Sequence, residues 1–180
     1  YGNNWIRHAI ARDAALDVRN YNPANHAARV QQTSALMDAT NPDLSAFFAR
    51  GGKLILRENA ADRAQSPQMG FDYYKAVVER LGQAAVDRSV RLYVSPGSTH
   101  TGNSRSVTDK TPVPTMVDLL DPLDRWVSAG QAPAEDLVQT RQAAQPPHTV
   151  LAARPLCLYP RYPHYTGGDK TRASSFACRP

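Results

Sequence analysis

The sequence predicts an α/β fold built around a parallel β-α-β unit, and two short apolar runs indicate this class. Residues 53–56 and 90–94 have the length and composition of strands, and each run ends in a polar loop. Between them, residues 67–81 carry apolar side chains at helical spacing, and Gly82 ends this helix. The order strand, helix, strand favours parallel pairing with a right-handed crossover.

The remaining elements follow from apolar spacing and from helix-breaking residues. We expect further helices at residues 4–19, 25–37 and 116–129, and a short helical turn capped by Asn41 with Pro42 at its first position. From Gln131 onward the pattern predicts mostly coil, with short strands near Val138 and at 150–151. A length of 180 residues is typical of one domain.

Composition argues against a nucleic-acid-binding or membrane-spanning protein. The net charge is +5, but the basic residues are scattered along the chain and form no dense stripe. No apolar run approaches the length that crosses a bilayer. The sequence starts at Tyr1 without a start methionine or a signal-peptide pattern, so we interpret it as a fragment, a processed chain or an ordered region.

The chain contains two cysteines, Cys157 and Cys178, which bracket a tail rich in Pro, Tyr and Gly. A disulfide between them would restrict the unfolded tail and stabilise the fold by about 3 kcal/mol in the loop-entropy account. The alternative is a pair of free, buried thiols. We favour the disulfide, because such a tail has little core of its own, and we therefore expect a secreted or periplasmic protein.

Asp62 and His100 are the candidate catalytic residues. Each follows one of the two predicted strands, so parallel pairing would present a carboxylate and an imidazole at neighbouring strand ends. That arrangement suits the acid and the base of a hydrolase triad. Taken singly, Asp62 is more simply a loop residue that caps the next helix, and His100 a solvated loop histidine. The combination is the more specific signal.

Other kinds of site have no support in the sequence. The remaining histidines show no metal-ligand spacing with cysteine or acidic residues, and no phosphate-binding glycine loop or dinucleotide fingerprint occurs. A G-x-S-x-G nucleophile elbow is also absent. Five serines lie near the two loops, and none sits on a strand-to-helix elbow: Ser66, Ser95, Ser98, Ser104 and Ser106. Ser95 and Ser98 are better explained as hydrogen-bonding loop residues than as nucleophiles. We therefore expect the nucleophilic serine to lie outside this chain.

Several segments between residues 36 and 180 resemble the tannase and feruloyl esterase family in order and spacing. They are Asp38–Phe47, Arg50–Leu56, Asp72–Tyr74, Arg91–His100, Leu119–Val127, Arg154–Pro160 and Ala173–Cys178. The resemblance implies the C-terminal portion of an α/β-hydrolase fold with a parallel sheet, closed by a coil-rich, disulfide-bonded tail. By position, Asp62 and His100 match the family's catalytic aspartate and histidine, and Cys157 and Cys178 its C-terminal disulfide.

The resemblance also implies an activity and a domain organisation. Members hydrolyse esters of hydroxylated aromatic acids, and related enzymes act on terephthalate monoesters. The partner of this chain would be an upstream segment that carries the serine, the oxyanion hole and a substrate-gripping lid, where calcium is possible. No cofactor or metal is expected within the chain itself. Residues 1–35 would return from the lid, 36–150 would form the hydrolase core, and 151–180 the tail.

Two departures from the family pattern keep a second interpretation open. Members commonly have His-Gly shortly before the aspartate, where this chain has Glu58 and Asn59, and a cysteine after the histidine, where this chain has Thr101. The missing cysteine removes a covalent link between the serine and histidine loops. The alternative to a carboxylic ester hydrolase is therefore a non-catalytic fragment or binding module that keeps the fold.

Overall fold

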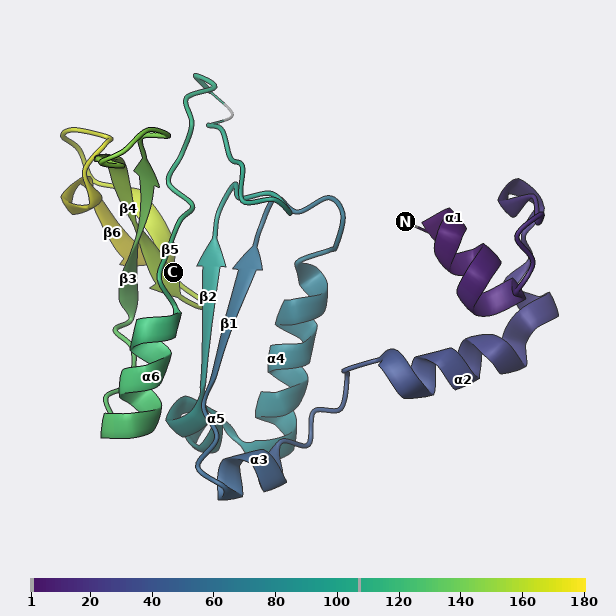
Figure 1. Ribbon diagram of the computed structural model, residues 1–180. Coiled ribbons are helices and arrows are strands. Elements are labelled where there is room, and N and C mark those ends of the chain that lie inside the picture. The colour runs from purple at the N-terminus through teal and green to yellow at the C-terminus, as the bar shows by residue number, and fades with distance from the viewer. Residues whose placement is uncertain (1, 107) are drawn as a thin grey trace. The chain divides into compact units, whose positions relative to one another are not determined.

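A computed structural model describes residues 2–106 and 108–180 (Figure 1). The chain divides into two compact units, which meet between Asn41 and Pro42, and each is described by itself. Within the described residues, no helix is both long enough and apolar enough to cross a membrane.

The first unit is helical. It contains α1 (Gly2–Asn4), a π-helical stretch (Trp5–Ala11), two 3-10 turns (Val18–Asn20 and Pro23–His26) and α2 (Ala27–Met37). The helix expected over 4–19 is too long, because Arg12 takes a left-handed conformation with φ 56° and ends the helical stretch. The helix expected over 25–37 is confirmed, with a 3-10 first turn.

The second unit is a mixed sheet with helices on both faces. Its helices are α3 (Ser45–Ala49), α4 (Gln68–Leu81), α5 (Gln83–Ser89), α6 (Leu120–Ala129) and a 3-10 turn (Ala173–Ser175). Its strands are β1 (Leu54–Asn59), β2 (Val90–Ser95), β3 (Asp136–Gln142), β4 (Val150–Leu158), β5 (Tyr162–Tyr165) and β6 (Phe176–Arg179). The main sheet has the order β1-β2-β4-β3, and β5 and β6 form a separate pair.

The predicted β-α-β unit is present. Strands β1 and β2 pair in parallel from Leu54 opposite Val90 to Asn59 opposite Ser95, so their carboxyl ends finish level. Helix α4 ends before Gly82 as expected, although the short helix α5 that follows was not predicted. The short turn expected at Asn41 begins later, because α3 starts at Ser45.

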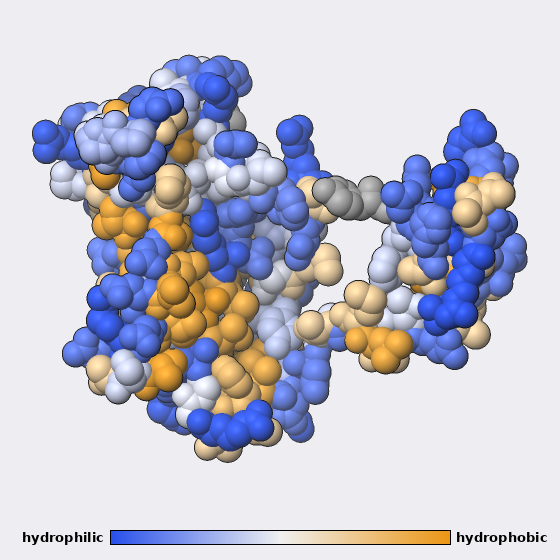
Figure 2. All heavy atoms as spheres, viewed as in Figure 1, coloured by the Kyte–Doolittle hydropathy of each residue, from blue (hydrophilic) through white to orange (hydrophobic). Residues whose placement is uncertain are grey.

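Helices cover the sheet on both sides. On one side, Val77 of α4 and Val86 of α5 are buried against Val90 of β2. On the other, Trp126 of α6 is buried, and the Arg91 guanidinium lies 5.0 Å from its ring centroid. Consecutive residues of a strand point to opposite faces of the sheet. Val90 therefore faces α4 and α5, and Arg91 faces α6. Figure 2 shows apolar side chains gathered on one face of this unit; exposed ones include Leu120 and Val127 of α6.

The C-terminal part contains more strand than the sequence predicts. Strands β3 and β4 pair antiparallel over seven residue pairs, and β4 joins the parallel strands through Leu158 and Cys157. The expectation of a coil-rich tail was therefore wrong. Apolar alternation fails here because the interior position Gln139 and the half-buried Arg154 are polar, and Pro155 interrupts the pattern in β4.

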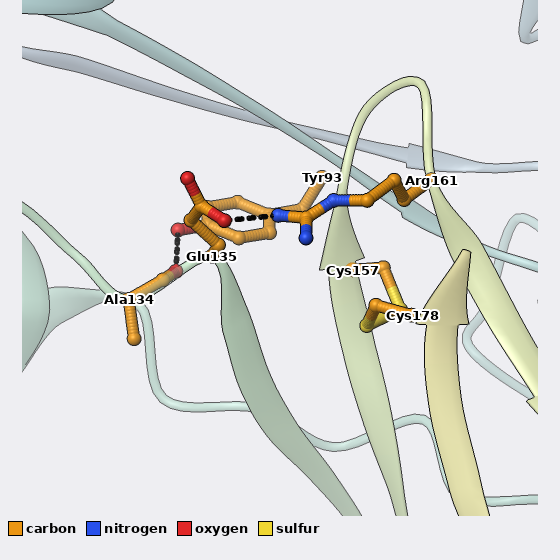
Figure 3. Close-up of a disulfide and its surroundings, with 6 residues drawn as sticks. All are labelled: Tyr93, Ala134, Glu135, Cys157, Arg161 and Cys178. Carbon is orange, nitrogen blue, oxygen red and sulfur yellow. Dashed lines mark hydrogen bonds and ion pairs between the residues drawn. A yellow bond between two sulfur atoms is a disulfide. The ribbon is translucent and has the colours of Figure 1, made fainter. Parts of the chain in front are cut away.

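The predicted disulfide joins Cys157 of β4 to Cys178 of β6, with their Cα atoms 5.6 Å apart (Figure 3). The same region is tied to the sheet by polar contacts. The Tyr93 hydroxyl donates to the backbone oxygen of Ala134, and Arg161 pairs with Glu135. Burial raises the pKa of Tyr93 to about 12.

Candidate active site

The candidate site is formed by the loops that follow β1 and β2, and backbone hydrogen bonds join these loops directly. The amides of Ala60 and Ala61 donate to the oxygens of Ser95 and Ser98 over 3.1 and 3.0 Å. The Asn59 side-chain amide donates to the backbone oxygen of Thr99 over 3.1 Å. Because both strands end at the same sheet edge, these bonds fix the two loops relative to each other.

Asp62 and His100 meet across the two loops. The Asp62 Oδ2 atom lies 2.8 Å from His100 Nδ1. The other carboxylate oxygen, Oδ1, accepts the backbone amides of Ala64 at 2.8 Å and Gln65 at 3.1 Å. One carboxylate oxygen thus holds its own loop and the other contacts the imidazole; Asp62 does not cap the next helix, because α4 begins at Gln68 without a side-chain cap.

The two side chains differ in solvent exposure. Asp62 is 12% exposed and His100 is 59% exposed. Burial raises the pKa of Asp62, but hydrogen bonds from His100 and from the Gln65 and Ala64 amides outweigh it, so the pKa lies below its usual value. The carboxylate is therefore ionised at neutral pH. Its charge favours a proton on Nδ1 of His100, which leaves Nε2 as the acceptor.

Glu58 is an electrostatic neighbour that the sequence analysis did not assign to the site. Its pKa is raised by burial and by the negative charge of Asp62. The side chain packs against α4 at Gly70, where an added Cβ would lie 1.8 Å from Glu58 Oε1. The absence of a side chain at Gly70 therefore makes room for this carboxyl group beside the site.

Three of the serines in these loops, Ser95, Ser98 and Ser104, are buried. Ser95 and Ser98 are fully buried, and Ser95 Oγ donates to Gln139 Oε1 over 2.8 Å. Ser104 Oγ donates to the backbone oxygen of Gly97, which turns the loop with φ +76°. In the described part of the chain, His100 makes no hydrogen bond to a serine. Ser95 thus has the hydrogen-bonding role that the sequence predicts, whereas Ser98 Oγ is buried without a hydrogen-bond partner among the described residues.

A cleft of about 1310 Å³ borders the site on the Asp62 side. Basic side chains are prominent in its lining: Arg63, Arg105 and Lys110. Among the described residues, no group of three histidine, cysteine or acidic side chains could hold a metal ion. The contact between the Asp62 carboxylate and the His100 imidazole is suited to proton transfer.

Comparisons with known proteins match one family profile and several esterases. The profile described as "Tannase and feruloyl esterase" matches residues 3–179. The chain belongs to the tannase and feruloyl esterase family. It is 37% identical over 182 residues to a probable feruloyl esterase of Arthroderma benhamiae, covering 98% of this chain and 33% of that protein. It is 38% identical over 156 residues to a mono(2-hydroxyethyl) terephthalate hydrolase of Piscinibacter sakaiensis, covering 82% and 24%.

Solved structures of the family share the fold. An esterase from Aspergillus oryzae superimposes with a TM-score of 0.82 at 22% identity, covering 99% of this chain and 37% of the other. Feruloyl esterase B from the same organism gives 0.79 at 24% identity with the same coverage. The expected α/β-hydrolase fold is confirmed. The chain spans about a third of the length of the curated relatives that it matches.

Proposed function

We propose that this chain supplies the acid and the base of a carboxylic ester hydrolase acting on esters of hydroxylated aromatic acids. The observation that carries the proposal is the 2.8 Å contact between Asp62 and His100 at the ends of two adjacent parallel strands. The nucleophilic serine lies outside these 180 residues, in an upstream part of the protein that also carries the lid. Residues 1–35 return from that lid.

The geometry suits a serine-type mechanism. His100 donates from Nδ1 to Asp62 and accepts the serine proton at Nε2 as the hydroxyl attacks the ester carbonyl. The resulting imidazolium, stabilised by the Asp62 charge, protonates the leaving alcohol. Water then attacks the acyl-enzyme with His100 again as base, and the aromatic acid is released. The exposure of His100 leaves its ring accessible to such a partner.

The substrate class rests on the relatives. Names among them include a probable feruloyl esterase and a mono(2-hydroxyethyl) terephthalate hydrolase, both of which indicate esters of aromatic acids. Any calcium would belong to the upstream lid. No step here depends on a metal. The Cys157–Cys178 disulfide supports a secreted or periplasmic location.

The experiment uses the full-length protein and methyl ferulate as the probe substrate. We expect His100→Ala to abolish turnover and labelling by a serine-reactive fluorophosphonate. His148→Ala, which removes an exposed histidine between β3 and β4, is the matched control and should leave both unchanged. A His100→Ala protein that hydrolyses the ester at the parental rate would refute the assignment.

The second candidate function is a non-catalytic module. Thr101 supports it, since it stands where relatives carry the cysteine that links the histidine and serine loops. The retained Asp62–His100 contact argues against it. A folded full-length protein that neither reacts with the phosphonate nor hydrolyses aromatic esters would establish this alternative.

A further inference from the structure

A second cavity, of about 490 Å³, lies between residues of strands β3 to β6 and the loop that carries Asp109. Its walls include Arg141, Arg154, Lys170, Asp109, Tyr165 and Phe176. Neither Asp62 nor His100 is among its lining residues, although Pro112 lines both this cavity and the cleft beside Asp62. The volume falls in the range typical of small-molecule sites.

Two arginines face this cavity from neighbouring strands. Arg141 of β3 is paired with Ala152 of β4, and Arg154 follows two residues along the same strand. In an antiparallel pair of strands, a residue shares its face of the sheet with the residue opposite it and with the residues two positions away along each strand. Arg141 and Arg154 are therefore diagonal neighbours on one face, with backbones about 7 Å apart. Like charges in such positions repel each other unless an anion lies between them.

Neither arginine has an anionic partner within the described residues. Both are half-buried, and the Nε atoms of both are buried without a hydrogen-bond acceptor. Burial lowers the pKa of Arg154, as expected for a cation removed from water without compensation. The Arg154 guanidinium stacks 4.6 Å from the Phe176 ring centroid. Stacking occupies one face of the guanidinium and leaves the N–H groups around its edge available.

The other charges of the cavity do not neutralise these arginines. Asp109 forms no ion pair with either one, and hydrogen bonds from Ser106 and Thr111 lower its pKa to about 2. Lys170 adds a further positive charge, with Nζ 5.6 Å from the Tyr165 ring centroid. Three cations therefore line the cavity against one carboxylate, and that carboxylate is already bonded to its own loop.

We infer that this cavity is a binding site for a small aromatic carboxylate, whose carboxylate group pairs with Arg141 and Arg154 and whose ring lies against Tyr165 and Phe176. Guanidinium groups match the planar, two-oxygen geometry of a carboxylate. The aromatic side chains favour a flat, apolar body over a fully hydrated anion such as phosphate. The inference does not depend on the proposed esterase activity.

Calorimetric titration of the full-length protein tests the site, with benzoate as the probe and benzamide as its neutral counterpart. We expect benzoate to bind at least tenfold more tightly than benzamide. Arg154→Met and Arg141→Met should each weaken benzoate binding by tenfold or more, because each removes a charge-assisted hydrogen-bonding partner. Arg154→Lys should restore part of the affinity. Arg88→Met, which removes an exposed arginine of α5, is the matched control.

The thermal midpoint without ligand provides a second measurement. Since Arg154 has no anionic partner, Arg154→Met should not lower it. Benzoate binding that survives both methionine substitutions, or that is lost in His100→Ala, would place the ligand elsewhere and overturn the inference. So would equal affinity for benzoate and benzamide. Absent benzoate binding combined with a lowered midpoint in Arg154→Met would show that a carboxylate side chain from the rest of the protein occupies the cavity.

Discussion

Replacing Asp62 by asparagine separates the two tasks of its carboxylate. In Asp62→Asn, the amide oxygen can keep the Oδ1 position and accept the same Ala64 and Gln65 amides, so the loop should hold its shape. The amide nitrogen then takes the Oδ2 position, 2.8 Å from His100 Nδ1. A donor at that place stabilises the imidazole tautomer with its proton on Nε2, which cannot accept the serine proton.

The expected loss is therefore in turnover and not in folding. Asparagine in place of a triad aspartate reduces kcat by about 10⁴-fold through the wrong tautomer, and we expect a loss of that order with little change in KM. The assay is hydrolysis of methyl ferulate by the full-length protein, with the thermal midpoint measured in parallel. Asp62→Ala should lower the midpoint as well, because it also removes the acceptor of the two backbone amides.

The matched control is Asp87→Asn, an identical change at a carboxylate on the surface of α5, which should leave kcat and KM at parental values. An Asp62→Asn protein that retains kcat within tenfold of the parent would refute the orienting role of Asp62. A midpoint as low as that of Asp62→Ala would instead show that asparagine does not preserve the Oδ1 contacts.

Three further predictions concern stability. Replacing Cys157 and Cys178 by alanine opens a loop whose ends are 21 residues apart in sequence. The unfolding free energy should therefore fall by about 3 kcal/mol, and the thermal midpoint by about 6–12 °C. An unchanged midpoint when the parent protein is reduced would contradict this prediction. Because the pKa of Tyr93 is raised from 10.0 to about 12, the linked contribution to the unfolding free energy is about 3 kcal/mol. It is present below pH 10 and lost as the pH rises toward 12, and Tyr93→Phe should flatten this decline in alkaline denaturation curves. Gln139→Leu should cost about 1–3 kcal/mol by leaving the buried Ser95 hydroxyl unpaired, and addition of Ser95→Ala should recover most of it in a double-mutant cycle.

The β-α-β unit could be predicted because its signals are local. Apolar runs of strand length, a helix with one apolar face and Gly82 as its stop define it without reference to distant contacts. The meeting of Asp62 with His100 then follows from topology, since parallel neighbours end at the same edge. The sequence could not reveal that one carboxylate would both hold its loop and contact the imidazole, because that depends on how each oxygen is oriented.

The C-terminal strands could not be predicted because their partners are distant and their interior positions are polar. Gln139 is almost fully buried, yet it breaks the apolar alternation that marks a strand. Its burial is tolerated because Ser95, 44 residues away, donates a hydrogen bond to it. The pairing of Arg141 and Arg154 across one cavity likewise follows from the β3–β4 register, which no short stretch of sequence encodes.

The position of Cys157 has a practical consequence for preparing this protein. It is paired with Val94 on β2, the strand that leads into the loop carrying His100. The disulfide therefore ties β6 to β4, the strand that pairs with the support of the imidazole loop, and material produced in a reducing cytoplasm would lack this link. Preparations should be exported through an oxidising compartment, and free-thiol content should be assayed before weak activity is attributed to the choice of ester.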